Sequence, residues 1–214
     1  MSRTVSTTSS EIVRKLPWGI HYSWIIVAIL AVVQVVGQSI GMAAGVMVTP
    51  LNDPNGDFGW NMGIIGAALA GYYTVGALFA PVSGWLGDRF GPRRLMLVGG
   101  ILFVTSMMLL GVVSQLWQFF LAFSVMLALT QSITMVPLLA SVSRWFRRRL
   151  GLGVGILLAA GGIGSAVLAP LVGYLLENIG WQGTFWGIGI VGGGVILLVW
   201  PFYRNRPADL GLKP

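Results

Sequence analysis

Long apolar runs alternate with short polar segments along the whole chain. Six runs, at about 22–48, 62–86, 95–113, 117–142, 152–176 and 184–203, hold no Asp, Glu, Lys, Arg or His. A helix needs about 20 apolar residues to cross the hydrocarbon core of a bilayer. Several tryptophans, including Trp18, Trp60 and Trp117, lie near the ends of the runs, as is typical of membrane interfaces. The pattern therefore predicts six transmembrane helices.

Composition narrows the class of protein further. Of 214 residues, 56% are hydrophobic and only 9% are charged, whereas a soluble domain has about 25% charged residues. The mean hydropathy is +0.83, and the chain has no cysteine. These values exclude a soluble globular domain, a disordered chain and a disulfide scaffold. We therefore expect an all-α membrane protein.

The charged residues predict how the helices are oriented. All 13 Lys and Arg residues lie in the amino-terminal tail, after the second run, after the fourth run or in the carboxyl-terminal tail. The three opposite connections hold instead Asp53, Asp57 and Glu177. By the positive-inside rule, both termini are then cytoplasmic and the number of spans is even. This layout also explains the net charge of +7 without nucleic-acid binding.

The expected organisation is a cytoplasmic tail over 1–20, a six-helix bundle over 21–203 and a second cytoplasmic tail over 204–214. Small residues four positions apart predict close helix packing, because they let helix backbones approach in lipid. These pairs and triplets are Gly37, Gly41 and Gly45; Gly161 and Ser165; and Gly189 and Gly193.

A specific motif lies between the second and third runs. Residues 84–95 read Gly-Trp-Leu-Gly-Asp-Arg-Phe-Gly-Pro-Arg-Arg-Leu. This segment resembles the signature loop of the major facilitator superfamily, Gly-x-Leu-Ala-Asp-Arg-x-Gly-Arg-Lys, and departs from it at Gly87 and Pro92. The resemblance implies half of a 12-helix fold. It also implies a gating motif that latches the two halves through Asp88, made of Gly84, Asp88, Arg89, Gly91 and Arg93.

Further segments narrow the resemblance to the oxalate/formate antiporter and monocarboxylate porter branch. They are Pro50-Leu51, Phe58-Gly59-Trp60, the Trp-Phe-Arg-Arg-Arg-Leu-Gly-Leu run at 145–152, and residues 206–214. This branch implies a small-molecule solute, a mono- or dicarboxylate, moved across the cytoplasmic membrane with a coupled proton or counter-solute.

Polar residues inside the spans are the candidates for a substrate cavity, since polar groups are costly in lipid and tend to face cavities. The alternative is that they form hydrogen bonds between helices. The resemblance implies that the first, second, fourth and fifth spans line the cavity. The candidates on these spans are Gln34, Gln38, Tyr72, Tyr73, Thr130, Gln131 and Thr134.

Carriers of this superfamily contain two six-helix halves, and the sequence provides one. It holds no catalytic, metal-binding or cofactor-binding constellation, so we expect no enzyme and no cofactor. Three interpretations remain. The chain is the amino-terminal half of a carrier, a half-size carrier that works as a homodimer or with a separate second half, or a six-helix membrane interaction protein that does not transport.

Overall fold

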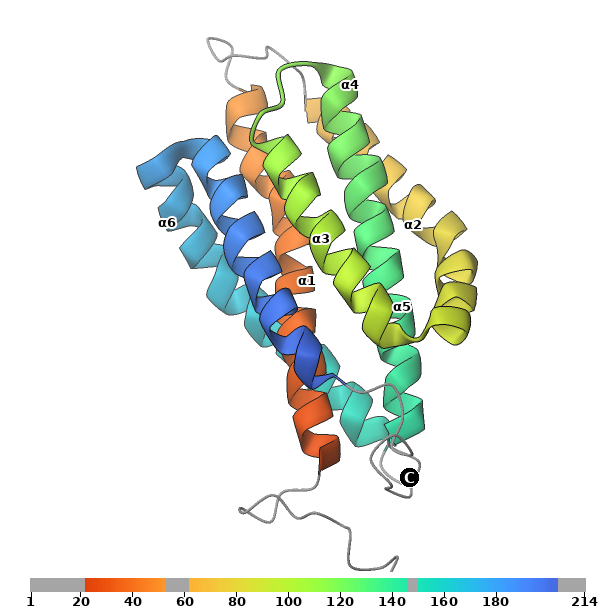
Figure 1. Ribbon diagram of the computed structural model, residues 1–214. Coiled ribbons are helices and arrows are strands. Elements are labelled where there is room, and N and C mark those ends of the chain that lie inside the picture. The colour runs from red at the N-terminus through yellow and green to blue at the C-terminus, as the bar shows by residue number, and fades with distance from the viewer. Residues whose placement is uncertain (1–21, 53–61, 146–149, 204–214) are drawn as a thin grey trace, which may run out of the picture.

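The computed structural model describes residues 22–52, 62–145 and 150–203, in which every regular element is a helix (Figure 1). The elements are α1 (Tyr22–Asn52), α2 (Met62–Phe90), α3 (Pro92–Leu110), α4 (Leu116–Phe119), the π-helix η2 (Phe120–Leu127), α5 (Ala128–Trp145), α6 (Leu150–Val199) and the short 3₁₀-helix η3 (Trp200–Phe202). The predicted tails 1–20 and 204–214 lie outside the described residues.

Helix α6 contains two antiparallel helices. A straight helix of its 50 residues would be about 75 Å long, more than twice the hydrocarbon thickness of about 30 Å. At Gly180 the backbone is not helical, with φ 72° and ψ 176°, a conformation open almost only to glycine. The chain reverses there (Figure 1). We call residues 150–179 the first limb and residues 181–199 the second limb.

Five segments of the described chain are long and apolar enough to cross a membrane. The last of them holds both limbs of α6, while α4, η2 and α5 follow one another as a single span. The prediction of six spans in an all-α membrane fold is therefore confirmed. The expected boundaries at 176 and 184 are wrong, since both limbs continue to Gly180 and leave almost no loop.

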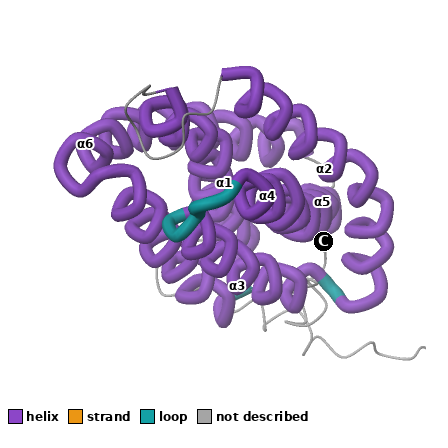
Figure 2. The backbone as a smooth tube through the Cα atoms, turned by 90° about the horizontal axis from the view of Figure 1, so that it is seen from above, coloured by secondary structure: helices purple, strands orange, loops and turns teal. Residues whose placement is uncertain are grey.

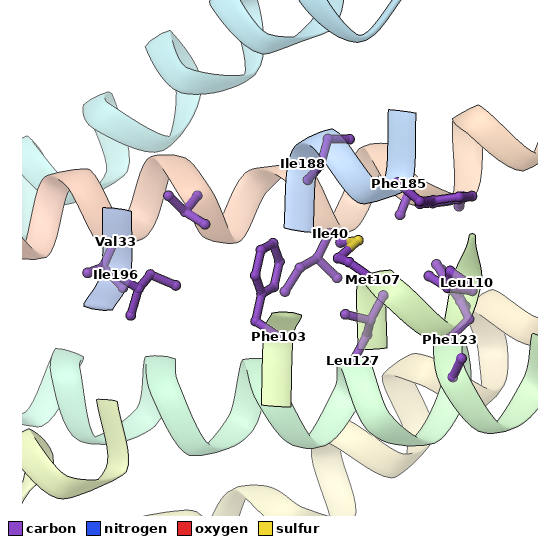
Figure 3. Close-up of a cluster of buried hydrophobic side chains, with 14 of the residues drawn as sticks. Val33, Ile40, Phe103, Met107, Leu110, Phe123, Leu127, Phe185, Ile188 and Ile196 are labelled. Atoms are coloured by element: carbon purple, nitrogen blue, oxygen red, sulfur yellow. The ribbon is translucent and has the colours of Figure 1, made fainter. Parts of the chain in front are cut away.

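The helices form one bundle in which α1 and α3 lie between α2 and α6. Helix α1 contacts α6 most extensively, α3 contacts α6 and α5, and α2 contacts α5 and η2. Seen along the bundle, α2 lies at one side and α6 at the opposite side (Figure 2). The core lies between α1, α3, η2 and the second limb, and its buried cluster includes Val33, Phe103, Leu127 and Ile196 (Figure 3).

Close approach occurs at some of the predicted glycines. A Cβ at Gly161 would lie 3.0 Å from Gln38 Nε2, and one at Gly189 would lie 2.7 Å from Met107 Cβ. The prediction of tight packing is confirmed at these positions. It is wrong at Gly41 and Gly45, where a Cβ would meet no atom of the described residues within 4 Å. Glycine spacing therefore indicates where helices can approach, but not where they do.

Candidate functional site

The predicted signature loop forms a turn of a single residue between α2 and α3. Gly91 has φ 81° and ψ 147°, and its N–H donates a hydrogen bond to the Gly87 carbonyl at 3.1 Å. A positive φ favours glycine. Pro92 then occupies the start of α3, where proline fits because no N–H is required. The departure from the family pattern at Pro92 therefore suits the start of a helix.

Asp88 lies where α2, α3 and α5 meet. It is exposed, and it lines a small hollow of about 70 Å³ together with Gly84, Gly87, Pro92 and Pro137. A Cβ at Gly87 would lie only 3.0 Å from the Pro137 ring. This contact explains why glycine stands at 87, where the family pattern has alanine.

The arginines of the motif contact aromatic rings. The Arg89 guanidinium lies 5.1 Å from the ring centre of Trp85. The Arg93 guanidinium lies 4.9 Å from the Trp200 ring, and Trp200 Nε1 donates a hydrogen bond to the Arg93 carbonyl at 2.9 Å. The contact between Arg93 and Trp200 joins the start of α3 to η3, which follows the second limb. The sequence analysis did not predict this contact, because nothing in the pattern pairs the start of the third span with the end of the sixth.

A second hollow, of about 350 Å³, lies between α2 and α5, and its lining includes Tyr72, Tyr73, Gln131 and Ser132. The rings of Tyr72 and Tyr73 meet edge to face, with centroids 5.2 Å apart. Gln131 Oε1 is buried and accepts no hydrogen bond in the described part of the chain. The structure thus brings three of the predicted cavity residues together around one space. Ser132 was not predicted to belong to it.

Gln34 and Gln38 lie at a different contact, between α1 and the first limb. A Cβ at Gly161 would lie 3.3 Å from Gln34 Nε2, and Ser165 Oγ donates a hydrogen bond to Gln38 Oε1 at 3.5 Å. The side chains of both glutamines thus lie against Gly161 of the first limb. They are not among the residues that line the hollow between α2 and α5.

Thr130 and Thr134 pack toward α3. Both are buried; Thr130 Oγ1 donates a hydrogen bond to the Met126 carbonyl at 2.9 Å, and the Thr134 hydroxyl lies against Gly99. In the described residues neither threonine lines the hollow between α2 and α5. The seven polar candidates are therefore divided among three places in the bundle.

Residues 35–214 match the family described as the Major Facilitator Superfamily. The chain belongs to this superfamily. It is 34% identical over 105 residues to monocarboxylate transporter 13 of Bos taurus, covering 49% of this chain and 25% of that protein. It is 31% identical over 112 residues to human monocarboxylate transporter 11, covering 52% of this chain and 24% of that protein. An MFS-type transporter of Gibberella moniliformis is 29% identical over 128 residues, 60% of this chain and 31% of that protein.

The matched segments thus span about a quarter to a third of these relatives. The resemblance to the monocarboxylate branch of the superfamily is confirmed. This member of the major facilitator superfamily is an integral membrane protein of a transporter family rather than of an enzyme family.

Proposed function

We propose that this chain forms the amino-terminal six-helix half of a secondary active transporter for a small mono- or dicarboxylate. Halves of three plus three helices rock against each other around a shared site in this superfamily. The names of the relatives support a carboxylate solute. The hollow beside Tyr72, Tyr73 and Gln131 carries the proposal, because it collects neutral hydrogen-bonding groups inside the membrane spans.

The groups in this hollow can bind a carboxylate only together with a positive charge from a second half. An unpaired carboxylate costs several kcal/mol in a low-dielectric site, and all 13 basic residues lie outside the six apolar runs. The phenol and amide groups can orient a solute through hydrogen bonds, but they cannot neutralise it. A cation from a second six-helix half completes the site in this proposal.

The remaining polar candidates take separate roles. Gln34 and Gln38 form a second polar patch apart from this hollow, where α1 meets the first limb. Thr130 and Thr134 take no part in solute binding in this proposal, because they do not line the hollow; the Thr130 hydroxyl donates within its own span, and the Thr134 hydroxyl packs against Gly99 of α3. The second half is a separate segment or a separate chain, because a second copy would bring no cation within its spans. The carrier acts in the cytoplasmic membrane, with both termini cytoplasmic and with a proton or counter-solute coupled to the carboxylate.

The test compares two substitutions in the complete carrier reconstituted in vesicles. Gln131→Leu removes a hydrogen-bonding group worth about 0.5–1.5 kcal/mol, so the dissociation constant for a labelled carboxylate should rise about two- to twelvefold. Thr134→Val is the matched control, since it removes a buried hydroxyl three residues away and should leave binding unchanged. Equal weakening by both variants, or by neither, would contradict the role of this hollow.

A further inference from the structure

The fourth span contains a π-helix that its own sequence does not require. Element η2 covers eight residues, Phe120–Leu127, and lies without a break between α4 and α5. Its sequence, Phe-Leu-Ala-Phe-Ser-Val-Met-Leu, holds no glycine and no proline, the residues at which helices usually bend or break. π-helical segments inside α-helices are rare and occur often at functional sites. The α-helical form is therefore also open to this segment, and its contacts decide between the two forms.

The contacts of η2 join it to the wall of the proposed solute site. Ser124 Oγ donates a hydrogen bond to the Ala68 carbonyl of α2 at 2.8 Å. The ring centroids of Phe123 and Tyr72 lie 5.7 Å apart, and Tyr72 lines the hollow beside Gln131. A solute that displaces the Tyr72 ring would thus change the packing of η2 directly.

In the described chain, every residue that the fourth span contributes to this hollow lies beyond η2. These residues are Ala128, Gln131, Ser132, Met135 and Val136. A π-helical turn holds about one residue more than an α-helical turn, because its hydrogen bonds run from i to i+5. If η2 became α-helical while α4 stayed in place, α5 would turn by about 100° and advance by about 1.5 Å. Each side chain of α5 would then take the place of the residue that follows it, which we call a change of register.

Such a change of register would withdraw Gln131 from the solute. At present Ser132 Oγ donates a hydrogen bond to the Gly76 carbonyl of α2 at 2.9 Å. After the turn, Gln131 would occupy the place of Ser132 against α2, and Thr130 would occupy the place of Gln131. We propose that η2 changes between its π-helical and α-helical forms during transport, and so moves Gln131 into and out of the solute site. The proposal rests on the function proposed above for this hollow.

A disulfide between α3 and α5 would hold the present register. A Cβ at Gly99 would lie 3.4 Å from the Thr134 Cβ, close to the separation of about 3.8 Å in disulfides. The chain has no cysteine of its own. Gly193 and Val104 form a matched control pair, because the corresponding distance is 3.5 Å and the pair ties α3 to the second limb. Only the first pair involves a helix that η2 would turn.

The experiment closes each disulfide in the complete carrier, in a form without other cysteines. Uptake and equilibrium binding are measured with a labelled monocarboxylate that the unmodified carrier takes up. If the half rocked as one rigid body, neither disulfide would affect uptake. We expect the oxidised Gly99→Cys/Thr134→Cys variant to bind the solute but to lose uptake, and to regain uptake on reduction. The oxidised Gly193→Cys/Val104→Cys variant should bind and transport normally.

A second cysteine pair reports the other register. Because each residue of α5 would take the place of the residue after it, Ile133 would then face Gly99. The Gly99→Cys/Ile133→Cys variant should therefore form its disulfide faster during solute exchange across vesicles than without solute. Neither position lines the hollow beside Gln131, so this measurement reports the register separately from solute binding.

Two results would overturn the proposal. Uptake that continues with the α3–α5 disulfide closed would show that the half moves as one body. Loss of uptake with both disulfides closed would indicate a general need for flexibility and no specific role for η2. By contrast, unchanged binding by Gln131→Leu would refute the proposed solute site, and the cross-links would still measure the register.

A deletion provides the test if the cysteine variants do not fold, as circular dichroism would show. Val125 lies in η2 and is 36% exposed, so its removal takes no side chain from the core. Deletion of Val125 removes the extra residue and lets the span become α-helical while α4 and α5 keep their places. The deletion should keep solute binding and abolish uptake, whereas Val125→Ala should keep both. Normal uptake by the deletion variant would contradict the switch.

Discussion

At the residue scale, the position of Asp88 separates it from the hollow that we propose for the solute. It is exposed at the end of α2, where three helices meet around a hollow of about 70 Å³, and it follows the glycine that contacts Pro137. This hollow is distinct from the one lined by Tyr72 and Gln131. The separation favours a role in the movement of the helices and not in holding the solute.

We therefore predict that Asp88→Asn slows the complete carrier without weakening its binding. Loss of a latch worth about 1–2 kcal/mol would lower the maximal uptake rate about 5- to 30-fold. Equilibrium binding of the labelled solute should change little, since the hollow beside Gln131 is untouched. Initial uptake rates and binding isotherms on the same preparation provide the measurement. Glu177→Gln, an exposed carboxylate on the first limb, is the control and should affect neither.

A tenfold weaker binding by Asp88→Asn, about 1.4 kcal/mol, would place this carboxylate in solute recognition and refute the latch.

At the element scale, α2 lies close to η2 and α5 at three successive places along its length. Ser124 Oγ donates to the Ala68 carbonyl at 2.8 Å, and Ser132 Oγ donates to the Gly76 carbonyl at 2.9 Å. Further along, Gly87 lies against the Pro137 ring. Serine and glycine hold the two helices near enough for side chain to backbone hydrogen bonds. The helix end that carries Asp88 is thereby fixed to α5.

The contact between Gly87 and Pro137 predicts that substitutions at these two positions affect stability in a coupled way. Gly87→Ala would place a Cβ 3.0 Å from the Pro137 ring, and such overpacking costs about 1–3 kcal/mol. The midpoint of thermal unfolding in detergent should fall. Pro137→Ala should restore much of the loss in the double variant, because it removes the ring that the new methyl group meets. Gly41→Ala, whose Cβ would meet no described atom within 4 Å, is the control and should not lower the midpoint, since alanine favours a helix more than glycine does.

If Gly87→Ala and Pro137→Ala lower the midpoint additively, the two positions do not act through their contact.

The sequence predicted the spans well and the faces of the helices poorly. Hydropathy reveals which residues lie at membrane depth, because charged groups are costly there. It does not reveal which way a residue points, since lipid-facing and buried surfaces are both apolar. Gln131 and Thr134 were therefore assigned to one cavity, whereas one lines the hollow and the other packs on α3. The tight hairpin at Gly180 was also missed, because a single glycine among many gives no distinctive signal.

At the scale of the whole molecule, the distribution of charge predicts orientation. The chain has no cysteine, so a cysteine introduced at Asn55 or Arg206 would be its only thiol. Both positions lie outside the described residues. We expect an impermeant thiol reagent on intact cells to label position 55 and not position 206, because basic residues are retained on the cytoplasmic side. Labelling of position 206 but not 55 would reverse the orientation, and labelling of both would contradict the even number of spans.

The last prediction is that the six helices do not transport by themselves. Alternating access needs two bundles that rock about a shared site, and this bundle forms one wall of it. The hollow beside Gln131 offers phenol, amide and hydroxyl groups, while every basic residue lies outside the apolar runs. A homodimer would supply a second wall but no cation within the membrane. Purified chain in vesicles should therefore show no saturable uptake of labelled carboxylate.

Addition of a second six-helix half should restore uptake only if that half carries Arg or Lys within a span. Replacing this cation with glutamine should abolish uptake while the two halves still co-purify, which separates loss of charge from loss of assembly. The physical reason is that a buried ion without a partner costs several kcal/mol. The few hydrogen bonds available in the hollow beside Gln131 stabilise the ion by less than that. Saturable uptake by the chain alone would show that a neutral site can carry the solute, and the division of labour between two halves would then be wrong.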